Sequence, residues 1–193
     1  DYQRRTPLHH AASNGHSDVV KELLGNESVL DSLNSKNAQR ETPLHCAADG
    51  DHLEVVIDLL RDHRTRVNPK NDNDWSPLHC AASRGHLEVV KALLGNTRVI
   101  VNARTDTADT PLHLAIKYGH YDVVLELLEK GAISNLKNKT MEEKNWSTIE
   151  YARNHAHSST IDAIVEKLQV SRAEKLNPWK FNLNPLIWCM ERL

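Results

Sequence analysis

The sequence predicts an all-α solenoid, and three regularities lead to that prediction. The tetrapeptide Thr/Ser-Pro-Leu-His occurs four times at spacings of 36, 34 and 34 residues, starting at Thr6, Thr42, Ser76 and Thr110. In each copy the pattern Val-Val-x-x-Leu-Leu begins thirteen residues after the Thr or Ser. An Asn stands eight residues before each of the three later copies, at Asn34, Asn68 and Asn102. A fixed period of this length is typical of units that stack side by side.

Each unit is predicted to fold as two short helices. The Thr or Ser is an N-cap whose hydroxyl can accept from a backbone N–H, and Pro follows at the first helical position. A Leu and, in three units, a pair of Ala give the first helix a slim face for close packing. This helix ends at Gly15, Gly85 or Gly119, or at Asp51 in the second unit, because these residues tolerate a left-handed backbone. The Val-Val-x-x-Leu-Leu pattern is the apolar stripe of a second, amphipathic helix.

These units resemble ankyrin repeats, whose usual period is 33 residues and whose first helix opens with a TPLH-type sequence. The resemblance covers residues 1–168, with units starting near Thr6, Thr42, Ser76, Thr110 and Ser147. Residues 1–5 correspond to the end of a preceding hairpin, so we expect further repeats upstream.

The fifth unit is degenerate and is predicted to be a C-terminal capping repeat. Residues 147–152 stand where TPLHxA is expected, and the stripe positions are occupied by Ile161, Ile164 and Val165. Terminal repeats are atypical because one of their faces meets solvent.

The loops depart from the family pattern in two ways. Ankyrin repeats usually have Gly two residues before the Thr, whereas this sequence has Arg4, Arg40, Asp74, Ala108 and Asn145. Because Gly adopts backbone conformations that other residues avoid, we expect irregular hairpin loops. The stretch KNKTMEEKNW after Asn135 lengthens the last hairpin, which we expect to be longer and more mobile than the others.

Composition excludes several functional classes. The chain has 193 residues and a formal net charge of −2, so it has no general attraction to nucleic acid or to anionic membranes. No apolar run approaches the roughly 18–20 residues that span a bilayer. Three cysteines without disulfide-framework spacing favour a reducing environment. We expect an intracellular, cytoplasmic protein; the nucleus, or the host cytoplasm for a protein of an intracellular pathogen, are the alternatives.

Histidine and cysteine side chains suggest a zinc or thiol site at two places. His79 is followed by Cys80, and His45 by Cys46. Adjacent helical residues point about 100° apart, so neither pair readily chelates one ion. The Cys position holds Leu114 in the fourth unit, which indicates a packing site. We expect no metal, cofactor or catalytic residue.

The resemblance implies structural roles for two further sets of residues. The His that ends each tetrapeptide should hydrogen-bond the cap and nearby backbone; these are His9, His45, His79 and His113. Asn68 and Asn102 resemble the asparagines that are hydroxylated in some ankyrin repeats, but hydrogen bonding across the hairpin is the favoured interpretation.

The resemblance also implies protein binding through a concave face made of hairpin tips and inner helices. Carried onto this sequence, the candidate partner-binding residues are Tyr2, Arg5, Gln39, Glu41, Asp49, Asp72, Asn73, Trp75, Arg84, Arg104, Asp106, Asp109, Lys117, Tyr118 and Trp146. Met141 falls at a variable position of the fifth unit. Trp75, Arg84, Tyr118 and Trp146 stand out because Trp, Tyr and Arg are frequent energetic anchors of interfaces.

Residues 169–193 form a compositionally distinct tail with two Asn-Pro pairs. We expect the tail to cover the open end of the last repeat. The alternative is a docking helix, because Pro-Leu-Ile-x-x-Met-x-x-Leu resembles the start of an F-box-like motif.

We therefore predict a monomeric, non-catalytic module that binds a protein whose identity the sequence does not reveal. The alternatives are the targeting segment of a larger enzyme, pathogen effector or channel, and a ubiquitin-ligase adaptor acting through the tail.

Overall fold

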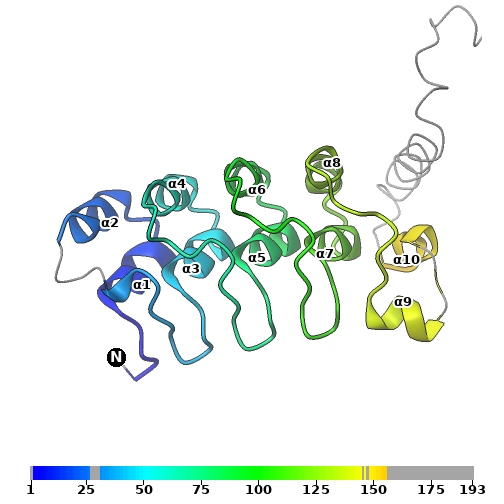
Figure 1. Cartoon of the computed structure of the whole chain (residues 1–193), viewed down its shortest axis with the longest axis horizontal. Coiled ribbons are helices and arrows are strands. Elements are labelled where there is room, and N and C mark those ends of the chain that lie inside the picture. The colour runs from blue at the N-terminus through cyan, green and yellow to red at the C-terminus, as the bar shows by residue number, and fades with distance from the viewer. Residues whose placement is uncertain (1, 27–30, 145, 147, 156–193) are drawn as a thin grey trace, which may run out of the picture.

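Figure 1 shows a computed structural model in which helix pairs stand in a row, each followed by a projecting loop. The structure describes residues 2–26, 31–144, 146 and 148–155. Within these ranges the chain forms helices joined by loops and has no strand. The helices are α1 (Pro7–Ser13), α2 (Ser17–Leu24), α3 (Pro43–Asp49), α4 (Leu53–Arg61), α5 (Pro77–Arg84), α6 (Leu87–Leu94), α7 (Pro111–Lys117), α8 (Tyr121–Glu129), α9 (Lys139–Lys144) and α10 (Thr148–His155).

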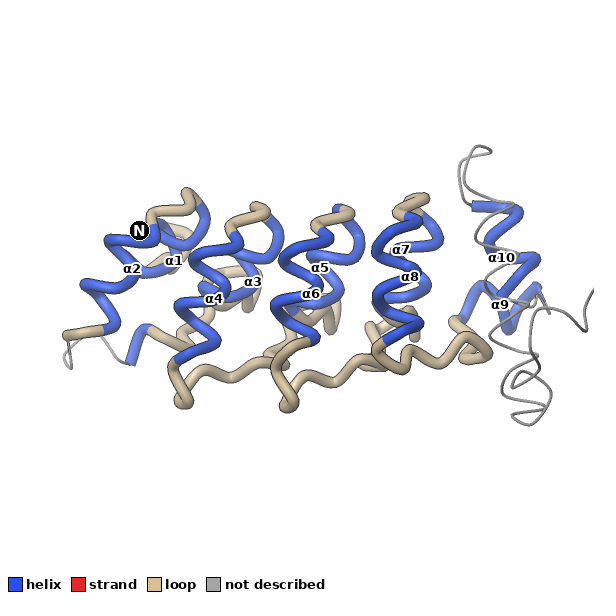
Figure 2. Tube along the Cα trace, turned by 90° about the horizontal axis from the view of Figure 1, so that it is seen from above, coloured by secondary structure: helices blue, strands red, loops and turns tan. Residues whose placement is uncertain are grey.

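The helices form two layers. Helices α1, α3, α5 and α7 pack in sequence as an inner layer, and α2, α4, α6 and α8 lie against them as an outer layer. Seen from above, the outer and inner helices of each repeat run side by side, and the connecting loops follow one edge of the array (Figure 2). The helix α10 extends the inner layer by packing on α7. The architecture is the predicted all-α solenoid.

The start of each inner helix is set by its own sequence. Thr6, Thr42, Ser76 and Thr110 are N-caps in an extended conformation, and each completes a capping box with the His three residues later. Pro occupies the first turn in all four helices, where no hydrogen bond is lost. The predicted caps are confirmed.

The core lies between the two layers. It contains the tetrapeptide Leu of each repeat, the Ala pairs and the Val-Val-x-x-Leu part of the stripe, except that in the first repeat Val19 is 45% exposed and Leu23 is only partly buried. Small Ala side chains let neighbouring inner helices approach closely. Burying each Leu contributes roughly 1.5–3 kcal/mol of transfer free energy, so neighbouring repeats stabilise one another.

The loops between repeats, which we call fingers, are regular, and the expectation of irregular hairpins is wrong for those described. Arg40, Asp74 and Ala108 adopt the left-handed backbone that Gly usually provides, with φ of 59°, 57° and 61°. Each finger is closed by a backbone hydrogen bond of 2.9–3.0 Å, for example from Asn37 N–H to the Glu41 carbonyl.

Side-chain hydrogen bonds inside each finger explain why the left-handed residue is tolerated. The Asn37 Oδ1 accepts from the backbone N–H groups of Gln39 and Glu41 at 3.0 and 2.8 Å. Asn71 repeats the arrangement in the next finger, and the Thr105 hydroxyl accepts from Asp109 N–H in the one after. These bonds offset the roughly 1–2 kcal/mol that a non-glycine residue loses there.

The last finger is longer than the others, as expected, and it contains the helix α9. Its greater mobility stays a prediction. The Asn138 side chain caps this helix by accepting from Met141 N–H at 2.8 Å. Met141 is only 1% exposed and belongs to the core. Its placement among the variable surface positions is therefore wrong, since its side chain fixes the insertion to the array.

The fifth unit is described only in its first half. Its helix α10 buries Tyr151 and Ala152, and the Tyr151 ring meets the His113 ring edge-on at 5.8 Å between centroids. The predicted second helix of this unit, with Ile161, Ile164 and Val165, and the tail at 169–193 lie outside the described residues. The domain boundaries at 168 and 169 stay predictions.

Candidate protein-binding surface

The histidine that ends each tetrapeptide links its repeat to the next one. The His45 Nδ1 accepts from Thr42 N–H at 3.1 Å, and its Nε2 donates to the Trp75 carbonyl at 2.9 Å. His9, His79 and His113 make the same two connections, to Glu41, Asp109 and Leu136. A ring whose Nδ1 accepts a backbone N–H is neutral and carries its proton on Nε2.

Burial keeps these rings neutral. Desolvation lowers the pKa of His45 to about 4 and that of His79 to about 4, and it also lowers the pKa of His9 and His113. Both ring nitrogens are occupied by protein groups. The four histidines therefore act as inter-repeat connectors, which confirms the structural role that the family resemblance implies.

A second row of histidines runs in the opposite direction. His52, His86 and His120 open the outer helices, and the Nε2 of each donates to a carbonyl of the preceding repeat at 3.0–3.1 Å. The His120 ring lies against Gly85 of the preceding repeat, where a Cβ would lie 2.5 Å from the His120 Nδ1. Gly85 also has φ of +79°. Sequence reasoning did not find the carbonyl acceptors of these histidines.

The asparagines at the 34-residue period form a third row. The Asn68 amide donates to the Arg98 carbonyl at 2.7 Å, and its oxygen accepts from Ile100 N–H at 2.8 Å. Asn34 and Asn102 bridge to the following loops in the same way. Both ends of each amide are engaged, although by the loop of the following repeat and not across the asparagine's own hairpin as expected.

Cys46 and Cys80, the two cysteines that the structure describes, have the environment of packing residues. Burial, followed by the nearby Asp49 carboxylate, raises the pKa of the Cys80 thiol, and burial raises the pKa of Cys46 to about 11. Thiols of this kind stay protonated and are poor nucleophiles. Across the described ranges, no three His, Cys, Asp or Glu side chains converge as a metal ion would require.

The ends of the inner helices carry exposed, chemically varied side chains. The Arg84 guanidinium pairs with the Asp49 carboxylate of the preceding repeat through contacts of 3.0 and 3.2 Å. Tyr118, which ends α7, is 43% exposed, and the Lys117 ammonium lies 5.5 Å from its ring centroid. These four candidate residues form one exposed row across three repeats.

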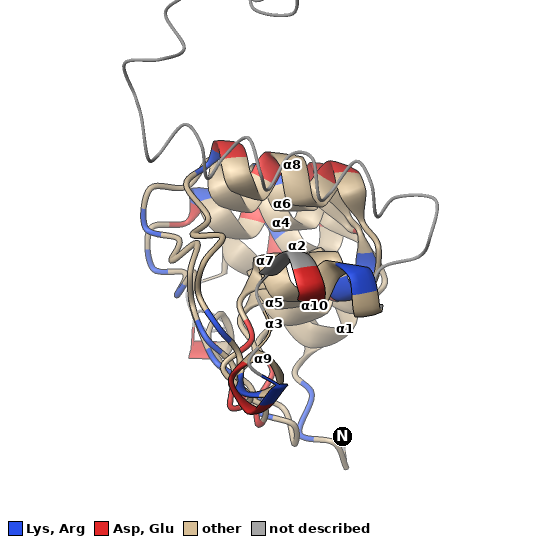
Figure 3. Cartoon of the chain, turned by 90° about the vertical axis from the view of Figure 1, so that its right-hand side faces the viewer, with Lys and Arg blue, Asp and Glu red and all other residues tan. Residues whose placement is uncertain are grey.

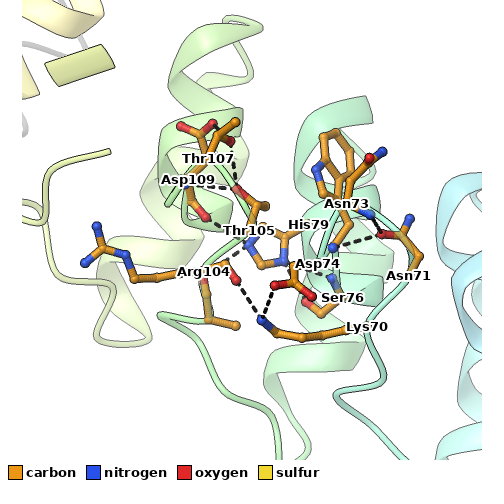
Figure 4. Close-up of polar contacts among 12 residues, drawn as sticks. Lys70, Asn71, Asn73, Asp74, Ser76, His79, Arg104, Thr105, Thr107 and Asp109 are labelled. Atoms are coloured by element: carbon orange, nitrogen blue, oxygen red, sulfur yellow. Dashed lines mark hydrogen bonds and ion pairs between the residues drawn. The ribbon is translucent and has the colours of Figure 1, made fainter. Parts of the chain in front are cut away.

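The finger tips form a second exposed row. Gln39, Asp72, Asn73 and Asp106 are all exposed. A single backbone hydrogen bond connects each tip to the next, from Asp72 N–H to the Gln39 carbonyl at 3.1 Å and from Asp106 N–H to the Asn73 carbonyl at 3.3 Å. Figure 4 shows two neighbouring fingers, with Asn71 and Thr105 holding the turns. We call the finger tips and the ends of the inner helices the inner surface.

Comparison with protein families agrees with this geometry. A family model described as "Ankyrin repeats (3 copies)" matches residues 1–71 and 56–140. The chain belongs to the ankyrin repeat family. No curated protein matches it significantly. Ankyrin repeats are generally protein–protein interaction modules and are typically non-catalytic.

Several candidate residues of this ankyrin array are also engaged within it. Arg5 donates to the Ser13 hydroxyl at 2.5 Å, and Glu41 accepts from the Asn37 amide at 3.0 Å. Arg104 donates to the Lys137 carbonyl. Asp109 accepts from the Thr107 hydroxyl at 2.7 Å and from Asn138.

The aromatic candidates divide in the same way. Trp75 and Trp146 are half-buried; the Trp75 ring lies 6.4 Å from the His79 ring, and Trp146 packs against the core. Tyr2 and Tyr118 are exposed. Of the four predicted anchors, Arg84 and Tyr118 therefore have the most surface to offer a partner. Within the described part of the ankyrin array, no helix has the length and apolar content to cross a membrane.

Proposed function

We propose that this ankyrin array is a non-catalytic, intracellular protein-binding module that engages its partner through the inner surface. One observation carries the proposal. At the ends of the inner helices, the residues that differ between repeats are exposed, whereas the capping histidines, which are the same in every tetrapeptide, are buried and hydrogen-bonded within the array.

The helix ends show this division clearly. The position before the left-handed residue holds Asn14, Gly50, Arg84 and Tyr118 in successive repeats, and all four are exposed. By contrast, the histidine that ends each tetrapeptide is the same in all four repeats and is buried. Residues free to differ without harm to the fold are the ones that set binding specificity.

The chemistry of the inner surface suits a polypeptide with both basic and apolar groups. Asp72 and Asp106 place carboxylates on adjacent fingers, and Tyr118 adds an exposed aromatic ring. The Arg84–Asp49 pair is about half exposed on each side. An exposed pair of this kind contributes about 0–1 kcal/mol to stability, so both side chains can turn toward a partner.

Rigidity supports the proposal as well. The two histidine rows and the asparagine row connect every pair of neighbouring repeats, so the inner surface is formed before a partner arrives. Preformed surfaces lose little conformational entropy on binding.

Site-specific photo-crosslinking tests the proposed function. A photoreactive amino acid replaces Tyr118 on the inner surface and, as the matched control, Lys91 on the outer helix α6. We expect a cross-linked protein of defined mass from position 118 and none of that mass from position 91. Equal cross-linking from both positions, or none from position 118, contradicts the proposal.

A further inference from the structure

A positively charged surface lies on the side of the fingers that faces away from the inner surface. It consists of the segments that lead from each outer helix into the next finger, at residues 31–36, 62–70, 96–104 and 130–137, and we call it the loop surface. These segments contain eight Lys and Arg against two Asp, although acidic residues outnumber basic ones, 26 to 24, in the whole chain. The end view shows Lys and Arg along the loop side and Asp and Glu on the outer helices (Figure 3).

One row of cations follows the repeat period. Lys36 Nζ donates to the Lys70 carbonyl at 2.7 Å, Lys70 Nζ donates to the Arg104 carbonyl at 3.0 Å, and Arg104 donates to the Lys137 carbonyl. Lys70 also lies 3.4 Å from an Asp74 carboxylate oxygen. A carbonyl orients a cation but does not neutralise it, and an ammonium group has three N–H donors, so Lys36 and Lys70 each keep at least one donor for a further partner. The row thus presents ordered positive charge.

Positive charges lie close together where the first finger meets the second. Desolvation, followed by the nearby Arg40 and Arg66, lowers the pKa of the Lys36 ammonium. An open pocket of about 390 Å³ lies beside it, lined by Lys36, Arg66, Val67 and Pro69 among others. An anionic side chain entering this pocket would meet two cations and an aliphatic wall.

Exposed aliphatic side chains lie on the same surface. Ile100 is 56% exposed and Ile133 is 39% exposed. Arg66, Ile100 and Ile133 occupy equivalent positions in successive repeats, since the N–H of each donates to the asparagine of the repeat before it. Arg66, Ile100 and Ile133 therefore lie in one row along the loop surface, in which two aliphatic residues follow a cation.

We propose that the loop surface is a second docking site, which takes an extended acidic polypeptide segment. Its carboxylates pair with Lys36, Lys70 and Arg104, and its aliphatic side chains pack on Ile100 and Ile133. Neighbouring packed helices lie about 8–10 Å apart. A polyproline II segment has three residues per turn and advances about 3.1 Å per residue, so carboxylates at every third residue share one face and match the spacing of the row. The four segments contain no Trp, Tyr or Phe, and single-stranded nucleic acids depend on such residues for stacking, which favours polypeptide over nucleic acid.

The test uses defined probes and the 193-residue chain. A fluorescent peptide of about twelve residues, built from the repeat Glu-Leu-Ser, is titrated with protein and followed by anisotropy. Controls are the same peptide with Lys in place of Glu and a single-stranded oligonucleotide of equal charge. We expect only the acidic peptide to bind, with an affinity that falls as salt is raised.

Two variants locate the binding. Arg66→Glu and Ile100→Ser each change a side chain whose own backbone N–H, not the side chain, bonds the preceding asparagine. Arg66→Glu should weaken the acidic peptide about tenfold and Ile100→Ser about threefold, in line with exposed charge and apolar contacts. Lys91→Glu makes the same charge change on the outer helix α6 and should have little effect.

Three results overturn the proposal. They are no binding of the acidic peptide at low salt, an equal loss with Arg66→Glu and Lys91→Glu, and binding of the oligonucleotide at least as tight as that of the peptide. Substitutions at Arg84 and Tyr118 should leave the acidic peptide bound. Failure of this test therefore leaves the proposed role of the inner surface untouched.

Discussion

Replacing a buried histidine should change how stability depends on pH. His79 is fully buried, its Nδ1 accepts from Ser76 N–H at 3.1 Å, and its Nε2 donates to carbonyls of Ala103 and Asp109. Protonation at Nδ1 would set a donor against the Ser76 donor inside the array. The folded state therefore excludes the charged ring.

The size of this pH effect follows from the linkage between proton binding and unfolding. Burial lowers the pKa of His79 from 6.5 to about 4. Between these values the unfolded chain holds a proton that the folded chain lacks, so unfolding becomes easier as the pH falls from 6.5 toward 4. Each pKa unit corresponds to about 1.4 kcal/mol, so this ring removes about 3 kcal/mol of stability across the window. Near pH 5 the slope is roughly 1.2 kcal/mol per pH unit.

The assay compares wild type with His79→Gln by urea denaturation, followed by circular dichroism, at several pH values from 7 to 4.5. At pH 7 the variant should be less stable by about 2–3 kcal/mol, because it loses buried hydrogen bonds. That deficit should shrink steadily below pH 6.5, since glutamine takes up no proton. His63→Gln, which changes an exposed ring, is the matched control and should follow the wild-type curve. Parallel curves for wild type and His79→Gln would refute the reasoning.

Three further predictions concern the connections between repeats, each measured by the free energy of unfolding in urea. Asn68→Ala should destabilise by about 1–2 kcal/mol because a carbonyl and an N–H of the next repeat lose their partner; an unchanged midpoint would contradict this. Gly85→Ala should cost at least about 2 kcal/mol, from its left-handed φ and the steric conflict with a neighbouring ring. Gly25→Ala, where a Cβ meets nothing closer than 3.5 Å, should stay within about 0.5 kcal/mol; equal effects would count against the argument. Ala108→Gly should stabilise by about 0.5–1 kcal/mol, because Ala108 holds φ of 61°; a loss would show that the finger does not strain that residue.

The inner helices could be predicted because their determinants are local. Thr42, Pro43 and His45 lie within four residues, and one capping box accounts for all three. The recurrence of the motif at a fixed period indicated that these residues have a structural role in every repeat. The role of Asn68 followed in the same way, because its period matched that of the caps.

Features that depend on a neighbouring repeat were harder to find. The acceptor of His120 is the Ser83 carbonyl, 37 residues earlier, and no sequence motif marks a backbone carbonyl. Gly precedes His86 and His120, but Asp51 precedes His52, so no single residue type marked these histidines in the sequence. Asp58 is another case: it is buried and accepts from the Ser17 hydroxyl at 2.7 Å in the preceding repeat.

The helix in the last finger was missed for a different reason. The family pattern was imposed on residues 135–146, although Asn138 followed by Lys139, Met141 and Glu142 has the features of a capped helix. For the inner surface, the sequence indicated which positions are exposed, but not which side chains are already engaged within the array. Trp75 and Tyr118 looked equivalent, and only the structure showed that Trp75 is half-buried, with its ring near that of His79.

The central claim is that the inner surface binds a protein partner with residues that the fold does not need. The most direct measurement is the affinity of the cross-linked and identified partner for the double variant Arg84→Ala/Tyr118→Ala, together with the thermal unfolding midpoint. The account predicts at least about a tenfold loss of affinity with a midpoint within a few degrees of wild type. Unchanged affinity, or a large drop in the midpoint that accompanies the loss, would contradict it.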